Sequence, residues 1–402
     1  MRSTSLAFRA AMLTLVLVLA AGCGAGSTPQ QPAQSSAPAQ SSAPAKAPEG
    51  GGTLAIGMGL MGISNLDPHK VDNVGTQSVA RLISDPLVDW VDGKYVGLLA
   101  EKWETTGDGL TYTFTLRSGV KFSNGNPFNA GVVKENYVRI TNTEKPLYPA
   151  SFLSNIGELA AVNDTTLKIT LKHLDPDFLM NLTQVYIVDP QAIAKAGEDA
   201  FGQAPVGTGP FKLVKFTPDQ EVALARNDNY WGAKPVLDEI KVKALPDPET
   251  MVTALQAGTV DLITFVPSKD VKALTDAGFV SKPFRAVNEV LVAINNNTVP
   301  KPLRQAICYS VDRDTILKTV YYSLGQPALS IAPPDGWAYE PNNNGFTYNP
   351  DKARQILDAA GYKDTNGDGI REKDGKPFTL DFPSRGSGEW LRATQMVQQM
   401  LK

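Results

Sequence analysis

The first fifty residues constrain most strongly what this chain can fold into, because they separate an export signal and a tether from the part that can form a core. Two arginines and no acid precede an apolar run of about a dozen residues, shorter than the ~20 residues of a membrane-spanning helix. The run ends in Ala-Ala-Gly-Cys, where small residues precede Cys23. We therefore predict a lipoprotein signal peptide over residues 1–22 and lipidation of Cys23. The alternative is an ordinary secretory signal peptide that contains Cys23 by chance.

Residues 23–50 consist mainly of Ala, Pro, Ser, Gln and Gly, with almost no large apolar side chain. Such a segment cannot bury enough surface to offset the entropy of ordering it, so we expect a flexible tether. Lipid, tether and body together predict an exported protein, anchored at the outer face of the cytoplasmic membrane or in the periplasm. The body, about 350 residues from Gly51 onward, is too long for one ordinary core, and two or more domains are expected.

The composition of the chain argues against several classes of function. With 38 basic and 41 acidic residues, the net charge of −3 offers no basic surface for nucleic acid. His69 and His173 are far apart, and the sequence contains neither a His/Cys cluster with zinc spacing nor the nucleophile motif of a hydrolase. The glycines of residues 57–62 match a dinucleotide fingerprint, but Pro68 and turn residues follow where a helix should begin. We expect no cofactor and no enzymatic activity.

Hydrophobic periodicity predicts that the body mixes strands and helices. Strands are expected over residues 53–58, 111–116, 165–171, 211–226 (two strands with a turn at Pro218 and Asp219), 260–266, 289–297 and 376–382. Helices are expected over residues 130–140, 248–258, 350–360 and 388–402, the first with Asn129 and the third with Asn349 as N-cap. The nearby acids Asp85, Asp89 and Asp92 are interpreted as a solvated turn face and not as an acid–base pair.

The loop after the third of these helices carries half of a calcium-binding pattern. Asp364, Asn366 and Asp368 occupy alternate positions and Gly369 follows, as at the start of an EF-hand loop. The twelfth position, where a bidentate Glu belongs, is Gly375, and a strand pattern follows where a second helix is needed. The loop is therefore a weak calcium candidate. The favoured interpretation is a turn whose side chains bond to their own backbone.

Several stretches, in a fixed order, resemble the family 5 extracytoplasmic solute-binding proteins, the peptide- and nickel-type receptors of ABC importers. These stretches are Asp85–Ala130, Val206–Gly232, Val290–Asn297, Lys301–Leu317 and Tyr348–Leu380. The resemblance extends from about Gly51 to Lys402. Family members usually continue for roughly a hundred residues more, so the resemblance also leads us to expect that this chain is truncated at its C-terminus.

The resemblance implies an α/β fold of the two-lobe periplasmic-binding-protein type with an extra inserted subdomain, in which mixed sheets are flanked by helices. The first lobe would comprise residues 51–86 and 191–284, and the inserted subdomain would comprise residues 87–190. The second lobe, incomplete, would comprise residues 285–402. Ligand would be enclosed between the lobes.

The function that the resemblance implies is a membrane-anchored, monomeric receptor that captures a solute and delivers it to the permease subunits of an ABC importer. Short peptides are the expected solute. A nickel chelate, an oligosaccharide or an opine on the same receptor fold is the alternative, and an exported calcium-dependent enzyme is a more distant one. No nucleic-acid partner is expected.

In such a receptor, ligand shifts the equilibrium between open and closed lobes because it contacts both lobes only in the closed form. Loops that leave strand ends at the lobe interface are therefore the expected ligand contacts. The candidates are Leu60, Met61, Asn65, Tyr148, Tyr186, Phe265, Val266, Asn288, Ser384, Arg385 and Trp390. Arg385 is a candidate partner for a ligand carboxylate. Tyr230 and Trp231 are interpreted as core residues.

Overall fold

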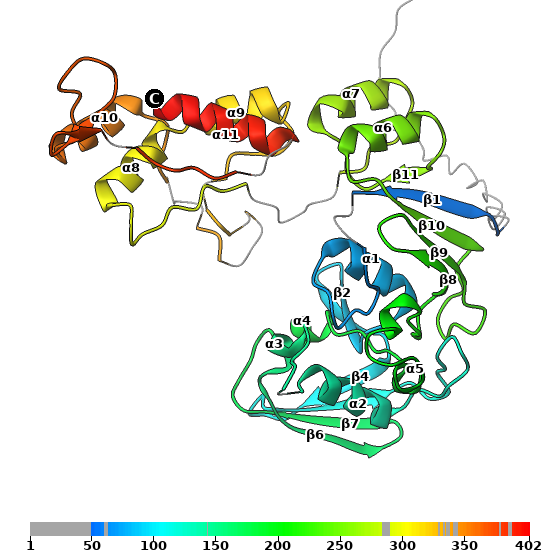
Figure 1. The fold of residues 1–402 in the computed structure, drawn as a ribbon. Helices are drawn as coiled ribbons and strands as arrows, with labels where there is room; N and C mark the ends of the chain where they lie inside the picture. Colours follow the sequence, from blue (N-terminus) through cyan, green and yellow to red (C-terminus); the bar gives the residue numbers. More distant parts are fainter. Residues whose placement is uncertain are drawn as a thin grey trace, which may run out of the picture. The chain divides into compact units, whose positions relative to one another are not determined.

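The structure is a computed structural model, and it describes residues 50–402 apart from residues 60–62, 143, 284–289, 329, 333, 335–337, 341–344, 378 and 385–387. The expected signal peptide, Cys23 and nearly all of the tether lie outside the described residues. The expected mixed α/β fold is confirmed, with several sheets and flanking helices (Figure 1). Within the described part of the chain, no helix combines the length and the apolar composition that a membrane crossing requires.

Five strands form a mixed sheet in the order β11-β1-β10-β9-β8 (Figure 1). Their bounds are β1 (Thr53–Met58), β8 (Phe211–Thr217), β9 (Glu221–Arg226), β10 (Glu239–Ala244) and β11 (Leu262–Ile263). β1 runs parallel to β10 and β11, whereas β9 is antiparallel to both of its neighbours. The turn between β8 and β9 falls at Pro218 and Asp219 as expected, and Asp219 takes a left-handed φ of 57°.

Three helices belong to the segments that build this sheet, namely α1 (Val74–Ile83), α6 (Pro248–Gln256) and α7 (Ser268–Asp276). The N-cap of α1 is Asn73, whose side chain accepts a hydrogen bond from Thr76 N at 2.8 Å. Val79 and Ile83 of α1 pack with the apolar residues of β9 and β10, so α1 covers one face of the sheet.

A four-stranded antiparallel sheet is built from the chain between β1 and β8, in the order β4-β5-β7-β6 (Figure 1). Its strands are β4 (Ala100–Thr105), β5 (Thr111–Leu116), β6 (Ile156–Asn163) and β7 (Thr166–Leu171), and a hairpin of β2 (Val88–Val91) and β3 (Lys94–Gly97) precedes them. The alternation that predicted β5 is visible in its burial, because Phe114 and Leu116 are buried between half-exposed threonines.

The helices of this second region are α2 (Ala130–Ile140), α3 (Ala150–Leu153), α4 (Phe178–Leu182), α5 (Pro190–Ala196) and the 3-10 turn η1 (Phe201–Gln203). Asn129 caps α2 as expected, accepting a hydrogen bond from Val132 N at 3.0 Å. Val133, Tyr137 and Ile140 of α2 are buried in a core shared with β5 and β7.

The C-terminal region contains α8 (Lys301–Ser310), α9 (Arg313–Val320), α10 (Pro350–Ala359), α11 (Gly388–Leu401) and the two-residue strands β12 (Glu372–Lys373) and β13 (Lys376–Pro377). α10 begins as expected, with Asn349 accepting a hydrogen bond from Lys352 N and Pro350 at the first helical position. α11 matches the helix expected over residues 388–402.

Three expected strands are wrong in length or existence. Only Leu262–Ile263 of residues 260–266 pairs as a strand, and only Lys376–Pro377 of the described residues within 376–382 does so. Residues 290–297 form no strand at all, and Val290 and Leu291 are exposed. A strand requires a neighbour for its backbone hydrogen bonds, and the described residues place no such neighbour beside residues 290–297.

Candidate functional site

The carboxyl ends of the parallel strands β1, β10 and β11 lie together at one edge of the five-stranded sheet. Leu245 N donates to Met58 O at 2.9 Å, and Thr264 N donates to Gly57 O at 3.1 Å, so the chain leaves all three strands at the same edge. Phe265 follows β11 at this edge with 47% of its surface exposed, and Val266 beside it is half-buried. In open α/β sheets this edge is where ligands bind.

Of the candidates that follow β1 in the sequence, Leu60 and Met61 lie outside the described residues. Asn65 is described, and its carboxamide serves its own loop because Oδ1 accepts a hydrogen bond from Asp67 N at 2.7 Å. A Cβ at Gly202 would come within 1.9 Å of the same Oδ1, so Asn65 packs tightly against η1. The structure gives Asn65 this internal contact, and its contact with ligand stays a prediction.

Beyond Asn65, the same loop carries a buried ionic network. Asp67 and His69 are both fully buried, and Arg139 of α2, which is 72 and 70 residues away from them in sequence, contacts both. Arg139 Nη2 donates to Asp67 Oδ2 at 2.6 Å and to Glu198 Oε2 at 2.7 Å. The network therefore joins the loop before α1 to α2 and to the segment after α5.

The hydrogen bonds of the network fix the tautomer of His69. Arg139 Nη1 lies 2.7 Å from His69 Nδ1, and a guanidinium can only donate, so Nδ1 is the acceptor. Nε2 consequently carries the proton and donates to Tyr186 O at 2.8 Å. Burial lowers the pKa of His69 to about 4, against the opposing effect of Asp67, so the ring is neutral at physiological pH.

Two candidate tyrosines, Tyr148 and Tyr186, are held by the backbone and ring of His69. Tyr186 is buried, its carbonyl accepts the His69 proton, and burial raises the pKa of its hydroxyl. Tyr148 N donates to His69 O at 3.0 Å, whereas the Tyr148 side chain is 39% exposed and meets Phe152 edge-on. Only Tyr148 therefore presents its ring to solvent.

A second buried carboxylate is that of Asp85. The chain passes between the five-stranded and the four-stranded sheet twice, near Asp85 and near Thr208, and Asp85 links these two segments. Asp85 Oδ2 accepts hydrogen bonds from Thr208 Oγ1 at 3.0 Å and from Trp231 Nε1 at 2.9 Å. Burial raises the pKa of Asp85, while these donors and Tyr230 oppose the rise. Trp231 also carries the Arg117 guanidinium over its ring, 4.7 Å from the centroid.

The interpretation of Asp85, Asp89 and Asp92 as a solvated turn face is wrong for the first two. Asp85 and Asp89 are buried, and Asp89 forms an ion pair with Arg81 of α1, whereas Asp92 is exposed in the turn after β2. Asp85 has partners more than a hundred residues away, and Asp89 pairs with Arg81 on the preceding helix, so the turn residues around these acids do not reveal their partners.

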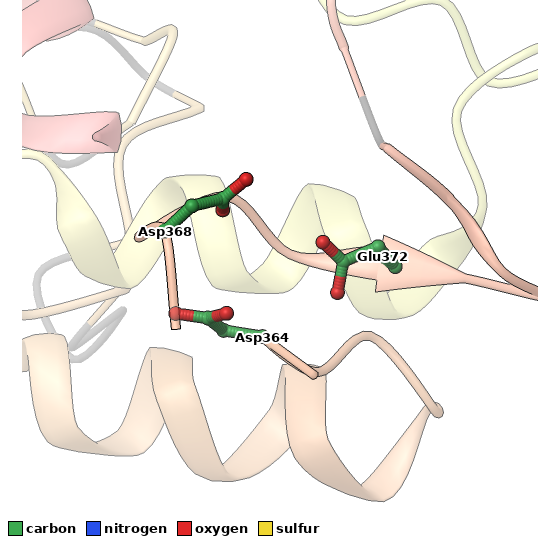
Figure 2. Close-up of side chains that lie close together, drawn as sticks. All are labelled: Asp364, Asp368 and Glu372. Carbon is green, nitrogen blue, oxygen red and sulfur yellow. The ribbon is translucent and has the colours of Figure 1, made fainter. Parts of the chain in front are cut away.

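The weak calcium candidate folds into a tight loop between α10 and β12, where Asp364, Asp368 and Glu372 approach one another (Figure 2). One oxygen of each carboxylate lies within 4.8 Å of the others, and Glu372 was not among the expected ligands. Asp364 accepts hydrogen bonds from Gly367 N and Gly369 N, and these donors lower the pKa of its carboxyl. Glu372 is buried and accepts from Thr365 N, Thr365 Oγ1 and Asn366 Nδ2. The carboxylates are thus already used as acceptors inside the loop.

The remaining candidates belong to the C-terminal region. Ser384 is exposed, and its hydroxyl lies 2.5 Å from that of Thr394 on α11. Trp390, 41% exposed, accepts a hydrogen bond from Thr394 Oγ1 through its backbone carbonyl. Asn288 and Arg385 lie outside the described residues.

Sequence reasoning missed the network around His69, although Arg139 gave a signal. The signal is its position: Arg139 lies in the last turn of the amphipathic helix α2, next to the buried Ile140. The interpretation of Trp231 as core is close to the structure, since its half-buried ring packs against the core of the four-stranded sheet.

Comparisons with known proteins agree on one family. The model of the family described as bacterial extracellular solute-binding proteins, family 5 Middle, matches residues 94–402. Heme-binding protein A of Haemophilus influenzae is 34% identical over 66% of this chain and 53% of its own length. Glutathione-binding protein GsiB of Salmonella typhi is 32% identical over 75% of this chain and 60% of its own length. The chain therefore spans little more than half of these relatives.

Among solved structures, an ABC transporter-associated periplasmic binding protein, DppA from Helicobacter pylori, in complex with the peptide STSA, is similar in fold. It superposes with a TM-score of 0.67 and 27% sequence identity, covering 78% of this chain and 67% of that one. The expected type of fold, that of a periplasmic binding protein, is confirmed by this likeness.

Proposed function

The chain belongs to family 5 of the bacterial extracellular solute-binding proteins, since the family model covers most of it, and we propose that it is a receptor that captures a solute outside the cytoplasm and delivers it to an ABC importer. The match over residues 94–402 is the observation that carries the proposal. The relatives reported above are named for binding and none is named as an enzyme. The receptor performs no bond chemistry.

The proposed solute is a short peptide. The Helicobacter protein that resembles this chain holds the peptide STSA and is associated with an ABC transporter. Glutathione and heme are the second candidates, because two relatives are named for binding them. A nickel chelate, an oligosaccharide and an opine remain alternatives on the same fold.

The proposed ligand contacts include the carboxyl edge of β1, β10 and β11. Phe265 supports this assignment, because an exposed aromatic ring at a strand end supplies contact area at little entropic cost. Residues 51–86 and 191–284 are proposed as one lobe, since their strands share one sheet, with residues 87–190 as its inserted subdomain. Residues 285–402 would belong to the other lobe, and ligand would favour the closed arrangement.

We also propose that the receptor is held at the membrane through lipidated Cys23. Gly51 N donates to Val236 O at 2.8 Å, and Gly52 N donates to Asp238 Oδ2 at 2.9 Å, which fixes the chain at the start of β1. A tether that ends at these bonds would leave the folded body free to reach a permease. Mass spectrometry of membrane-extracted protein tests the anchor, because lipidation adds acyl mass to a peptide that begins at Cys23.

Native mass spectrometry of the chain without residues 1–23 tests the receptor and its solute together. After incubation with a mixture of short peptides, glutathione and heme, we expect a series of peptide masses on a compact charge distribution. Exclusive retention of glutathione or heme would overturn the peptide assignment and leave the receptor. Retention of none of them by a compact chain would overturn the peptide assignment, and the same test would then be made with a nickel chelate, an oligosaccharide and an opine. Retention of none of these either would overturn the receptor.

A further inference from the structure

The loop between α10 and β12 contains a peptide unit with its own chemistry, Asn366–Gly367. Both residues are exposed, and Gly367 takes a left-handed φ of 80°. The backbone nitrogen after an asparagine can attack the side-chain carbonyl carbon, and glycine offers least obstruction because it has no Cβ. Such an attack needs a group that removes the proton from the nitrogen and a donor that polarises the carbonyl.

The loop supplies both groups at Asn366. Gly367 N donates its proton to Asp364 Oδ1 at 2.6 Å, so a carboxylate is placed on the proton that must leave. Asn366 Oδ1 accepts a hydrogen bond from Asp368 N at 2.9 Å, and this donor would stabilise negative charge on the side-chain oxygen.

A second Asn-Gly unit in the same chain, Asn124–Gly125, is a natural comparison. It is also exposed, Gly125 has a φ of 93°, and Asn124 Oδ1 accepts from Asn126 N at 3.1 Å. The difference lies at the attacking nitrogen, because Gly125 N donates to the backbone carbonyl of Phe122 at 2.8 Å. An amide carbonyl is a far weaker base than a carboxylate.

We propose that Asn366 is a site of spontaneous deamidation, with Asp364 as the general base. Asp364 takes the Gly367 amide proton as the nitrogen bonds to Asn366 Cγ. The Cγ–Nδ2 bond then breaks, and Nδ2 leaves as ammonia with that proton, which gives a cyclic imide. Water opens the imide at either carbonyl, producing aspartate or isoaspartate at position 366 with no oxidation or reduction.

The modification would alter the loop that makes it. Asn366 Nδ2 donates to Asp368 Oδ2 and to Glu372 Oε1, each at 3.1 Å, and both bonds would be lost. A new carboxylate would face Asp364, Asp368 and Glu372, whose oxygens already lie within 4.8 Å of one another. Like-charge repulsion would loosen the pairing of Lys363 with Glu372 at the end of the loop.

Peptide mapping of the intact chain during incubation in neutral buffer tests the proposal. Trypsin releases Asn366 in the peptide of residues 364–371 and Asn124 in that of residues 122–134, and fragmentation distinguishes aspartate from isoaspartate. We expect the ratio of the Asn366 rate to the Asn124 rate to be at least about tenfold higher in the folded chain than in the urea-unfolded chain, where both units lose their partners. A folded ratio equal to or below the unfolded ratio would overturn the proposal.

The variant Asp364→Asn keeps an oxygen acceptor for Gly367 N but removes the base. We expect it to lower the Asn366 rate to about the level of the unfolded chain and to leave Asn124 unchanged. Asp351→Asn, at an exposed acid on α10, is the matched control and should alter neither rate. Deamidation of Asn366 at the original rate or faster in Asp364→Asn would show that the carboxylate restrains the loop instead of activating it.

Discussion

Arg139 Nη2 lies 2.6 Å from Asp67 Oδ2, and the Asp67 side chain is fully buried. This ion pair links α2 to the loop before α1. It therefore joins two parts of the chain that are 72 residues apart, away from solvent. Buried ion pairs add little net stability compared with apolar packing, but removing one partner leaves the other charge buried and uncompensated. This cost can be measured by replacing either residue of the pair.

Arg139→Met should lower the free energy of unfolding by about 3–5 kcal/mol, because Asp67 would stay buried without its cation. Urea unfolding followed by circular dichroism measures the change. Arg354→Met is the control, since its ion pair with Asp351 is exposed on both sides and should be worth less than about 1 kcal/mol. Equal effects of the two substitutions would show that the Asp67 pair behaves as a surface pair.

The stability of the chain should fall as the pH is lowered from about 6.5 toward 4, because of His69. Burial lowers the pKa of His69 from its ordinary 6.5 to about 4, so the unfolded chain binds the proton more readily than the folded chain in this window. The contribution of the neutral His69 to the free energy of unfolding is fully present above pH 6.5. It is lost as the pH falls toward 4, because the unfolded chain becomes protonated first. The loss approaches about 3 kcal/mol below the folded pKa.

Urea midpoints across this pH range, in His69→Gln and in His173→Gln, isolate the effect. Glutamine keeps a donor and an acceptor but does not titrate, so the first variant should lose this part of the pH dependence. His173 is exposed, and its replacement should leave the profile intact. An unchanged profile in His69→Gln would assign the dependence to other groups.

Local patterns predicted the elements whose information is local. Asn129, Asn349 and the alternating residues of β5 each specify their element through neighbours in sequence, and the structure confirms them. Residues 290–297 begin with an apolar run that predicted a strand, but the described residues contain no partner strand for it, so the pattern alone was insufficient. Strand pairing depends on residues that are distant in sequence, so local patterns in one sequence do not predict it.

The polar junctions were unpredictable for the same reason. Asp85 meets Thr208 and Trp231 across more than a hundred residues, and nothing in its neighbourhood distinguishes it from the exposed Asp92. For the candidate site, the rule that loops follow strand ends placed Phe265 and Val266 at the carboxyl edge of the sheet. The same rule did not predict that Tyr186 would be buried.

Trp231→Phe should cost about 1–3 kcal/mol of stability, because the buried Asp85 would lose the indole donor while the aromatic ring is kept. The matched control is Trp90→Phe, which should change stability by less than about 0.5 kcal/mol because Trp90 is 43% exposed. Both are measured by urea unfolding at neutral pH. A cost for Trp231→Phe no larger than that of the control would mean that Thr208 and Tyr230 satisfy Asp85 without the indole.

Calcium should leave the stability of the chain unchanged. The carboxylates of Asp364, Asp368 and Glu372 lie close together (Figure 2). Their oxygens already accept hydrogen bonds from the loop, so a cation would have to compete with those donors. Thermal unfolding in calcium and in a chelator should therefore coincide. A specific site would instead stabilise the folded chain by about 2.7 kcal/mol at a hundredfold excess of calcium over its dissociation constant.

Phe265→Ala should weaken peptide binding about tenfold, equivalent to about 1.4 kcal/mol, if the carboxyl edge of the five-stranded sheet is part of the proposed ligand site. Phe265 is 47% exposed where the chain leaves β11, so the loss of its ring removes contact area for a ligand and little packing of the core. Val214→Ala is the control, because Val214 is 62% exposed on β8, at the opposite side of the sheet from β11. Isothermal titration with a tetrapeptide compares the two variants, and urea unfolding verifies that each stays as stable as the parent chain. If Phe265→Ala bound the peptide as tightly as Val214→Ala did, the ligand contacts would have to be sought elsewhere, beginning with the exposed ring of Tyr148.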